Sequence, residues 1–535
     1  MITIAIVAIL IVLFYHYGKR NFDYWAKQGV KHDHPIPFFG TDARRYFLQK
    51  SVTDMAAEVY WKYPKERFVG YFRGNKPELV IRDPDLIKQI IVNDFTSFYR
   101  RGLSQKHKVM EPLLRNLFFV DGDLWRLLRQ RMTPAFSSGK LRGMFPLVCE
   151  KATRLQTMLT KAEQSKTLDA RDVMARYTTD FIGSVGFGLD PDSINDDNSE
   201  FRKLGLKIFA ITPTRAITTI LKSLFPYIFK NLKFLGQEVE DEILGIVNSI
   251  QKQRNYKPSG RNDFIDLLLE LKEKGKIVVE SLERVNRDGT PETVEMEMDD
   301  ELMAAQAFIF FAAGFETSSS ATSFTLHQLA FNPEVQKKVQ ADIDKVLARY
   351  DDKLCFDAIK EMHYLEWTFL EAMRMFPSSG YLMRQCTKKY TIPGTSVTID
   401  EGFNVVIPLQ AIHNDPQYFE NPTEFRPERF SPEEVAKRHK YVYLPFGEGP
   451  RSCIGGRLGK MQSIAGLAAV LSRFSVVPSE ETKFHLEADP KTTIVQNVVG
   501  GIPLRFVKRT DVGDVGNGEI RETVLSTEHS DRTLA

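Results

Sequence analysis

Apolar residues recur at helical spacing along most of the chain. This pattern predicts helices over residues 124–132, 238–254, 303–331, 365–376 and 457–474. Short runs that are rich in valine and isoleucine predict strands over residues 67–72, 77–81, 396–399 and 404–409, and a hairpin over residues 492–506. The pattern therefore predicts a mainly α-helical protein with small β-sheets at its edge, an α+β fold.

The N-terminus differs from the rest, because residues 1–18 are apolar almost without a break and a basic pair, Lys19 and Arg20, follows them. Seventeen helical residues span roughly 25 Å, close to the thickness of a bilayer core. A cleaved signal peptide carries its positive charge before the apolar run and small residues after it. We therefore expect a retained transmembrane anchor with the remaining chain on the cytosolic side. A cleaved signal or a buried helix is the alternative.

The rest of the chain divides into three unequal parts. Residues 19–50 form a basic linker that contains proline. Residues 51–508 contain no repeat, low-complexity linker or shift in composition, and they predict one domain. Residues 509–535 are polar and contain no aromatic side chain, and they predict a disordered tail.

Composition excludes several classes of protein. The 535 residues are 43% hydrophobic and 26% charged, as in globular proteins, and the net charge of +3 gives no sign of nucleic-acid binding. The cysteines are far apart and contain no C-x-x-C pair, which argues against a disulfide framework and a zinc site. They are Cys149, Cys355, Cys386 and Cys453.

One cysteine stands in an unusual setting, the glycine-rich stretch FGEGPRSCIGG at residues 446–456, directly before a predicted helix. Glycines allow close approach of the backbone, and amides at a helix N-terminus favour a thiolate at Cys453. Arg451 adds a cation for an anionic cofactor group. The setting suits an axial ligand beneath a flat metal cofactor. The residues alone leave open a core thiol, half of a disulfide and a nucleophile.

The stretch matches the pattern F-x-x-G-x-R-x-C-x-G, and in this it resembles the haem-binding signature of the cytochrome P450 monooxygenases. The matching residues are Phe446, Gly449, Arg451, Cys453 and Gly455. The resemblance extends along the body and is strongest to insect microsomal members that detoxify plant toxins and insecticides. It implies a cytochrome P450 fold, one catalytic domain behind the anchor, and haem b with the Cys453 thiolate on its iron, where the thiolate favours O–O cleavage.

Two further motifs fit the same family. WRLLR places Trp125 and Arg129 four residues apart on one helix face, where both can donate to a carboxylate. The resemblance makes that carboxylate a haem propionate, and it adds Arg101 and Arg384 as further propionate ligands. EAMR gives Glu371 and Arg374, which the family joins to a second arginine in PERF. That arginine is Arg429, and the resemblance gives all three residues a structural role.

The stretch AAGFETSSS, within the predicted helix 303–331, resembles the family's oxygen-handling motif. It supplies Ala313 as a cofactor contact and an acid–alcohol pair, Glu316 and Thr317, as the catalytic residues. The threonine hydroxyl can bond the carbonyl four residues earlier and loosen the helix there. Activation of O₂ needs protons, which an acid and an alcohol can deliver. A polar pair that faces solvent is the alternative.

The substrate contacts that we expect are mostly apolar, which predicts a lipophilic substrate. They are Phe118, Phe119, Ile309, Ala312, Ser379, Leu382, Val498 and Val499. The basic and apolar segment 201–235, with Pro213 and Pro226 as breakers, fits either a buried helix pair or an access lid that dips into the membrane.

No flavin or NADPH motif is evident, so electrons derived from NADPH must come from a partner. The resemblance implies NADPH–cytochrome P450 reductase, with cytochrome b5 as a further candidate, and a place in the endoplasmic reticulum membrane with the catalytic domain on the cytosolic face. Basic residues are candidates for the docking surface. They are Arg126, Arg131, Lys140, Arg457 and Lys460.

The resemblance implies a monooxygenase that inserts one atom of O₂ into lipophilic molecules by hydroxylation, epoxidation or dealkylation. Three alternatives stay open. The enzyme could act in the biosynthesis of endogenous lipids or hormones. It could be a peroxide-dependent isomerase or dehydratase, which the pair Glu316 and Thr317 argues against. It could also be a non-catalytic haem carrier or sensor.

Overall fold

The structure is a computed structural model that describes residues 2–103, 111–162, 166–210, 212–225, 227–261 and 263–509. The tail predicted beyond Arg509 and the breaker Pro226 lie outside the described residues. The first helices are α1 (Ile2–Lys19), α2 (Tyr24–Lys27), α3 (Ala43–Tyr46), α4 (Val52–Lys62), α5 (Pro84–Lys88), α6 (Gly122–Met132), α7 (Ser138–Lys161), α8 (Ala170–Ile182), α9 (Glu200–Phe209) and α10 (Pro213–Leu224). The later helices are α11 (Gln237–Gln253), α12 (Phe264–Glu273), α13 (Asp300–Phe331), α14 (Pro333–Leu347), α15 (Phe356–Glu361), α16 (His363–Met375), α17 (Leu409–Ile412), α18 (Pro432–Lys437) and α19 (Gly456–Arg473).

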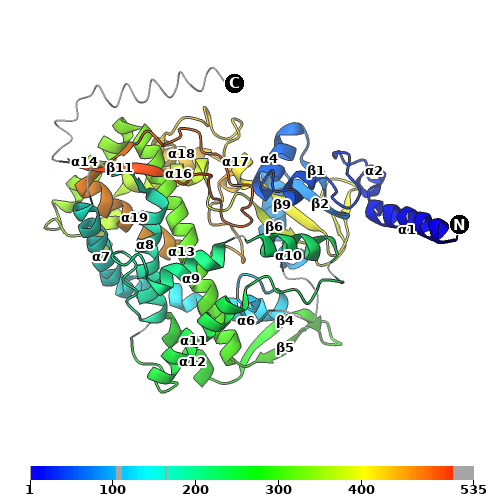
Figure 1. Cartoon of the computed structure of the whole chain (residues 1–535), viewed down its shortest axis with the longest axis horizontal. Coiled ribbons are helices and arrows are strands. Elements are labelled where there is room, and N and C mark those ends of the chain that lie inside the picture. The colour runs from blue at the N-terminus through cyan, green and yellow to red at the C-terminus, as the bar shows by residue number, and fades with distance from the viewer. Residues whose placement is uncertain are drawn as a thin grey trace.

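The strands form small separate sheets. They are β1 (Phe68–Arg73), β2 (Lys76–Ile81), β3 (Leu168–Asp169), β4 (Ile277–Val285), β5 (Pro291–Met296), β6 (Leu382–Gln385), β7 (Tyr390–Thr391), β8 (Thr398–Ile399), β9 (Asn404–Ile407), β10 (Phe474–Pro478) and β11 (Pro503–Lys508). The sheet orders are β1-β2-β9-β6, β10-β11-β3, β4-β5 and β7-β8. Helices make the body and the sheets lie at its edge (Figure 1), so the predicted α+β class is confirmed.

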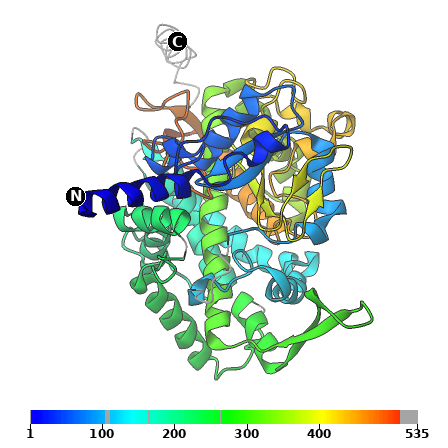
Figure 2. The ribbon, with the colours of Figure 1, turned by 90° about the vertical axis from the view of Figure 1, so that its right-hand side faces the viewer.

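The longest helix, α13, runs through the middle of the body in both ribbon views (Figures 1 and 2). It begins where the Asp299 side chain accepts from the Leu302 amide, and it ends at Asn332, before a proline that cannot continue it. Helices α8, α16 and α19 pack around it. Because α13 is apolar on nearly all sides, it is stable only when other helices bury it.

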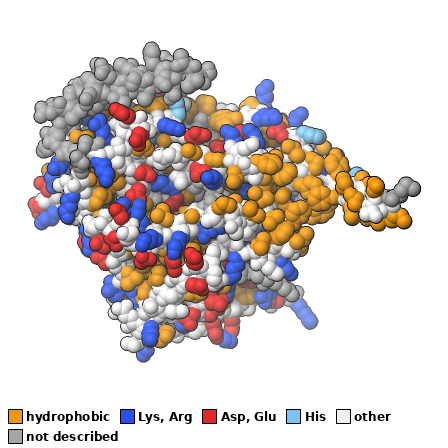
Figure 3. All heavy atoms as spheres, in the orientation of Figure 1, with side chains coloured by type: hydrophobic (Ala, Val, Ile, Leu, Met, Phe, Trp, Pro, Cys, Tyr) orange, Lys and Arg blue, Asp and Glu red, His pale blue; other side chains and the backbone are white. Residues whose placement is uncertain are grey.

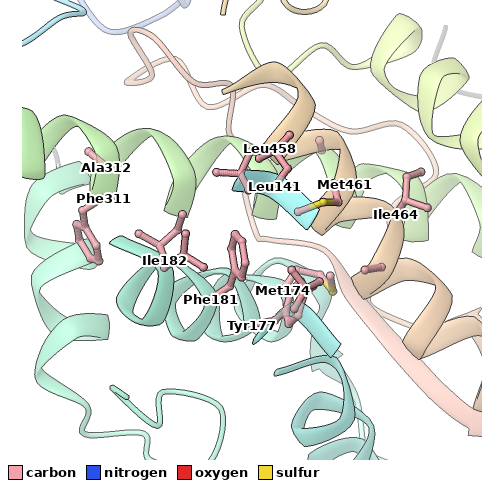
Figure 4. Packing of buried hydrophobic residues seen from close by; sticks show 14 of the residues in the cluster. Leu141, Met174, Tyr177, Phe181, Ile182, Phe311, Ala312, Leu458, Met461 and Ile464 are labelled. Atoms are coloured by element: carbon pink, nitrogen blue, oxygen red, sulfur yellow. The ribbon is translucent and has the colours of Figure 1, made fainter. Parts of the chain in front are cut away.

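The core between α7, α8, α13 and α19 is close-packed (Figure 4). Phe181 is fully buried there, and burial of such a ring is worth roughly 1.5–3 kcal/mol. Glycines allow the helix backbones to approach: a Cβ at Gly314 would lie 2.3 Å from Ile182 Cδ1, and one at Gly466 would lie 2.7 Å from the Tyr177 ring. This packing fixes the position of α13 relative to α19, which follows the cysteine loop.

Two β features differ from the expectations. The predicted hairpin over 492–506 is wrong, because β11 pairs with β10, and Val498 instead bridges to Ala488. The glycines at 500 and 501, both with positive φ, turn the chain before Pro503 starts β11. The hairpin of β4 and β5, which the sequence analysis did not predict, lies between α12 and α13.

Helix α1 projects from the body with its apolar side chains exposed, and it is the one described helix that alone is long and apolar enough to cross a membrane. The segment expected to be a linker packs on the first sheet, since Trp25 is fully buried and its Nε1 donates to the carbonyl of Tyr71 at 3.1 Å. The large indole ring lets this mostly polar segment bury apolar surface against the sheet. Helix α1 is therefore followed directly by a segment that packs on the folded body.

Candidate active site

Cys453 lies in the loop that connects Phe446 to α19, and local contacts hold this loop in shape. The Cys453 amide donates to the Phe446 carbonyl at 2.8 Å. Gly449 has a φ of 74°, and a Cβ there would lie 2.1 Å from the carbonyl oxygen of Ile91, so only glycine fits. The loop glycine in the motif is thus a steric requirement.

The Cys453 sulfur is placed where positive potential gathers. Burial raises the pKa of the thiol, whereas the Gly455 amide and the guanidinium groups of Arg101 and Arg129 lower it. Protein surrounds the loop, yet the Cys453 side chain keeps accessible surface. All four cysteines are free thiols, which removes the disulfide alternative. Within the described residues no cluster of His, Cys, Asp or Glu could hold a metal, so a metal there would need further ligands from a cofactor.

Basic residues from three segments converge on this loop. Arg129 Nη1 donates to the Ser452 carbonyl at 2.7 Å, and Arg101 Nη2 donates to the Arg451 carbonyl at 3.2 Å. The Arg451 guanidinium lies over the Trp125 ring, 4.1 Å from its centroid. The residues expected to hold propionates therefore surround the backbone of the cysteine loop.

Arg451 itself is occupied by the protein. Its Nε donates to the Tyr99 carbonyl at 2.9 Å, both terminal nitrogens donate to the Val120 carbonyl, and Nη2 also pairs with Asp121 Oδ1 at 2.7 Å. With every nitrogen engaged, this arginine holds the cysteine loop against α6. Its guanidinium is not directed at a cofactor group by the contacts seen here.

Arg384, on β6, is the opposite case. It is 2% exposed, and its Nε is buried without a hydrogen-bond partner among the described residues. Burial lowers the pKa of Arg384 to about 9, that of Arg101 to about 10 and that of Arg451 to about 8. Asp121 is the one carboxylate in the described part of the chain that pairs with these groups. Buried cations in excess over carboxylates are costly, so the cluster requires a bound anion.

These residues fit haem. The Cys453 sulfur is available for the iron, and an orphaned guanidinium nitrogen together with uncompensated positive charge is available for the two propionates. Arg101, Arg129 and Arg384 are the cations that would hold them. The Phe446 ring packs on Gly456, at the start of α19 beside the loop.

The middle of α13 presents an open stripe, with half-buried Phe310 and Gly314 beside it, on a helix that is buried for most of its length. Ile309, Ala313 and Thr317 are spaced four residues apart and are not buried, whereas every residue from Ser318 to Phe331 is buried. Thr317 Oγ1 donates to the Ala313 carbonyl at 2.6 Å, which is the backbone contact that the sequence predicted. A further hydroxyl, that of Ser378, donates to the Thr317 carbonyl at 3.0 Å. The stripe combines a small apolar surface with one alcohol.

Glu316 points elsewhere. It is 8% exposed and pairs with Arg171 at the start of α8, and Arg171 also bonds the Asn497 side chain. Burial raises the pKa of Glu316 while the arginine lowers it. Glu316 therefore does not face solvent, whereas Thr317 lies on the open stripe. Arg171 was not found from the sequence, because nothing local marks a contact across 145 positions.

The predicted structural triad meets in one buried cluster. Arg374 Nε and Nη2 donate to the two Glu371 oxygens at 2.8 and 3.0 Å, and Arg429 Nε donates to Glu371 at 3.2 Å. The side chains of Glu371 and Arg374 are fully buried. Arg374 also donates to the carbonyls of His413 and Pro422, so it links α16 to the segment before the cysteine loop.

The candidate substrate contacts do not all share one environment. Phe118 lies against the Arg101 guanidinium at 4.3 Å and edge-on to Phe119, close to the basic cluster. Ala312 is buried in the core, one position away from the open stripe that Ile309 begins. The others are placed on segments that flank α13. Ser379 donates to the Tyr381 carbonyl next to Leu382, Val498 joins the core cluster, and Val499 is 44% exposed.

Most of the expected docking cations are engaged within the protein. Arg126 pairs with Glu280 at 3.3 Å, and Arg131 donates to the Val278 carbonyl at 3.3 Å, both on β4. Lys460 pairs with Glu366 at 2.6 Å. Arg126 and Arg131 therefore contact the unpredicted hairpin, and the docking surface stays a prediction.

A cysteine loop at a helix start, an orphaned buried guanidinium and an apolar helix stripe with one alcohol are the features of a haem-thiolate site. The family model for Cytochrome P450 matches residues 32–501. Cytochrome P450 6B2 of Helicoverpa armigera is 38% identical over 95% of this chain and 98% of its own length. Cytochrome P450 6a2 of Drosophila melanogaster is 37% identical over 94% and 98%, and cytochrome P450 6k1 of Blattella germanica is 34% identical over 95% and 97%. The chain belongs to the cytochrome P450 family.

The protein is accordingly a haem-dependent monooxygenase that uses O₂ and electrons derived from NADPH. The bound haem supplies the iron at which O₂ is activated. The chain's residues do the rest. Cys453 would supply the thiolate for the iron, the arginines would hold the carboxylates, and Ile309 and Ala313 would give the adjoining space an apolar wall that excludes water. Thr317 places a hydroxyl on the same face, where it can hold a proton.

Proposed function

We propose that this enzyme oxidises lipophilic foreign compounds, such as insecticides and plant toxins, at the endoplasmic reticulum membrane. The observation that carries the proposal is an apolar surface continuous with the N-terminal helix. Lipophilic compounds concentrate in a membrane, so an enzyme that contacts the bilayer through such a surface meets them there.

The apolar surface lies where α1 leaves the body (Figure 3). Phe14 of α1 stacks on Phe38 with ring centroids 4.1 Å apart and lies 6.5 Å from Phe225, directly after α10. Large apolar side chains near this junction are exposed, which an aqueous surface disfavours. They are Ile36 at 51%, Phe47 at 62%, Ile217 at 57% and Ile228 at 73%.

The two interpretations of segment 201–235 are distinguished by burial. Helix α9 buries only Leu204, Gly205 and Ile208, and α10 buries only Thr218. A helix pair with so little buried surface is not a core pair, and its position beside α1 supports the membrane-dipping lid. Lys222 and Arg215 on α10 keep charge within reach of lipid headgroups.

The apolar stripe on α13 supports a lipophilic rather than an ionic substrate. On another face of α13, the ring of Phe209 of α9 lies 5.9 Å from that of Phe315, and the ring of Phe201 lies 5.7 Å from that of Phe311. The lid is thus connected to α13 through aromatic contacts. Electrons would come from NADPH–cytochrome P450 reductase, with cytochrome b5 as a second donor, because the sequence contains no motif for binding flavin or NADPH.

The test is reconstitution of the full chain with reductase, lipid vesicles and NADPH. We expect NADPH-dependent oxidation of several unrelated insecticides and plant toxins, and no product from Cys453→Ala. Efficient turnover of one endogenous sterol or fatty acid, with none of the foreign compounds oxidised, would instead support a biosynthetic role. Haem-loaded protein that oxidises nothing would support a carrier.

Membrane attachment is measured separately. The full chain should stay with membranes after extraction at alkaline pH. A chain that lacks residues 2–19 should still bind vesicles, weakly, through the exposed residues near α10. If this shortened chain shows no vesicle binding above that of an Ile217→Asp, Ile228→Asp variant of it, the lid does not contact lipid.

A further inference from the structure

The hairpin of β4 and β5 is the least expected element of the fold, and it packs on α6. It projects from the lower part of the body in Figure 2, and Figure 1 shows β4 beside α6. Asp123 accepts from the Ser281 hydroxyl at 2.7 Å and from the Leu282 amide at 2.6 Å, near the N-terminus of α6. These contacts fix the hairpin against the helix that carries Trp125 and Arg129.

Glu283 connects the hairpin to a second segment. Its Oε1 accepts from the Tyr99 hydroxyl at 2.9 Å and from Arg100 Nη2 at 2.5 Å. Its carboxylate also lies against Gly122, where a Cβ would come within 2.7 Å of it at a φ of 65°. One carboxylate thus contacts both the segment directly before Arg101 and the first residue of α6.

The two segments that Glu283 joins hold the cofactor cations. The Tyr99 carbonyl accepts from Arg451 Nε, and the Arg101 amide donates to Asp121 Oδ1 at 2.8 Å. Asp121 in turn pairs with Arg451. The bonds to Arg100 and Tyr99 lower the pKa of Glu283 against the effect of burial, so the acceptor is ionised. A charged acceptor makes the stronger hydrogen bond.

We propose that Glu283 is a positioning residue for the haem site, and that the hairpin holds Glu283 in place against α6. By fixing Tyr99 and Arg100, Glu283 holds the neighbouring Arg101 guanidinium where it can reach a haem carboxylate. The hairpin carries no haem contact itself in this proposal. Loss of the Glu283 carboxylate would loosen Arg101 and raise the rate at which haem leaves. It would leave the rest of the fold intact.

The experiment measures haem dissociation, which needs neither substrate nor reductase. Purified full-length protein is mixed with an excess of apomyoglobin, and haem transfer is followed by absorbance. We expect Glu283→Ala to lose haem about three- to tenfold faster, because two hydrogen bonds to a charged group are removed. Glu283→Gln, which keeps one acceptor oxygen, should lie between Ala and the native protein.

The matched control is Glu295→Ala on the same hairpin. Glu295 pairs with Lys276 at 2.9 Å, on the exposed edge, and contacts neither Tyr99 nor Arg100 in the described structure. This variant should lose haem at the native rate. Equal rates for the Glu283 and Glu295 variants would overturn the proposal.

A double-mutant cycle with Tyr99→Phe separates positioning from general damage. Because Tyr99 and Glu283 act through one hydrogen bond, the rate increase in the double variant should be smaller than the product of the two single effects. Independent, multiplicative effects would overturn the proposal. It would also be overturned if Glu283→Ala raised the protease sensitivity of the whole chain by the same factor as the rate of haem loss.

Discussion

The buried carboxylate of Glu371 provides a quantitative test of how the fold behind the haem is held. Glu371 accepts from Arg374, from Arg429 and from the Arg426 amide, and the side chains of Glu371 and Arg374 are 0% exposed. Glu371→Gln keeps the volume but leaves two buried guanidinium groups without their counter-charge. Breaking a buried pair in this way costs about 3–5 kcal/mol of unfolding free energy.

The assay is thermal unfolding of the haem-loaded protein followed by circular dichroism. For a chain of 535 residues the unfolding entropy makes 1 kcal/mol correspond to about 1 °C in Tm. Glu371→Gln should therefore lower the Tm by about 3–5 °C. Arg429→Met leaves the Glu371–Arg374 pair in place, and it should lower the Tm by about 1–3 °C for the loss of hydrogen bonds to charged groups.

The control is the same substitution one turn away on α16. Glu366 pairs with Lys460 at 2.6 Å, but the two side chains are 30% and 40% exposed. An exposed pair is worth about 0–1 kcal/mol, so Glu366→Gln should change the Tm by no more than about 1 °C. If Glu371→Gln and Glu366→Gln gave the same Tm, the burial argument for this triad would be refuted.

Three further outcomes are expected. Cys453→Ala should abolish the red-shifted Soret band of the reduced, CO-bound protein, and its persistence would mean that another residue binds the iron. Thr317→Ala should release peroxide while product falls, and an unchanged product yield per NADPH would remove its role in proton delivery. His327 is buried neutral, with its Nε2 2.9 Å from the Lys483 carbonyl, and burial lowers its pKa to about 4. The unfolded state then binds more protons below pH 6.5, so stability should fall by about 2 kcal/mol from pH 7 to pH 5. Urea unfolding should show a shallower pH slope for His327→Gln, and an equal slope would contradict this assignment.

The pairing of Glu316 with Arg171 changes how the acid–alcohol motif is understood. The motif places an acid next to an alcohol in sequence, but neighbouring positions on a helix point about 100° apart. Thr317 faces the open stripe, while Glu316 faces α8 and the loop of Asn497. Any proton that passes between them must cross by way of water or a moving side chain, since no direct bond joins them in the structure.

The sequence determined the features whose information is local. Periodicity located the helices around α6, α11, α13, α16 and α19, since burial of one face or all faces leaves a direct trace in residue order. The motif around Cys453 predicted the local backbone. Gly449 and the helix start at Gly456 lie within a few residues of Cys453, and they fix the position of its sulfur. The i−4 bond of Thr317 is local in the same sense.

Only the tertiary structure decided the contacts between segments that are distant in sequence. Arg451 matches a cofactor motif, yet its partners are Tyr99, Val120 and Asp121, more than 300 positions away, and they use every nitrogen it has. Arg126 is a surface cation by sequence, but it pairs with Glu280 of a hairpin about 150 positions later. Such pairings leave no periodic pattern in the sequence. A hydrogen bond between distant segments forms only where the packing of the whole core brings their backbones together. The charge balance around the haem site is therefore a property of the fold.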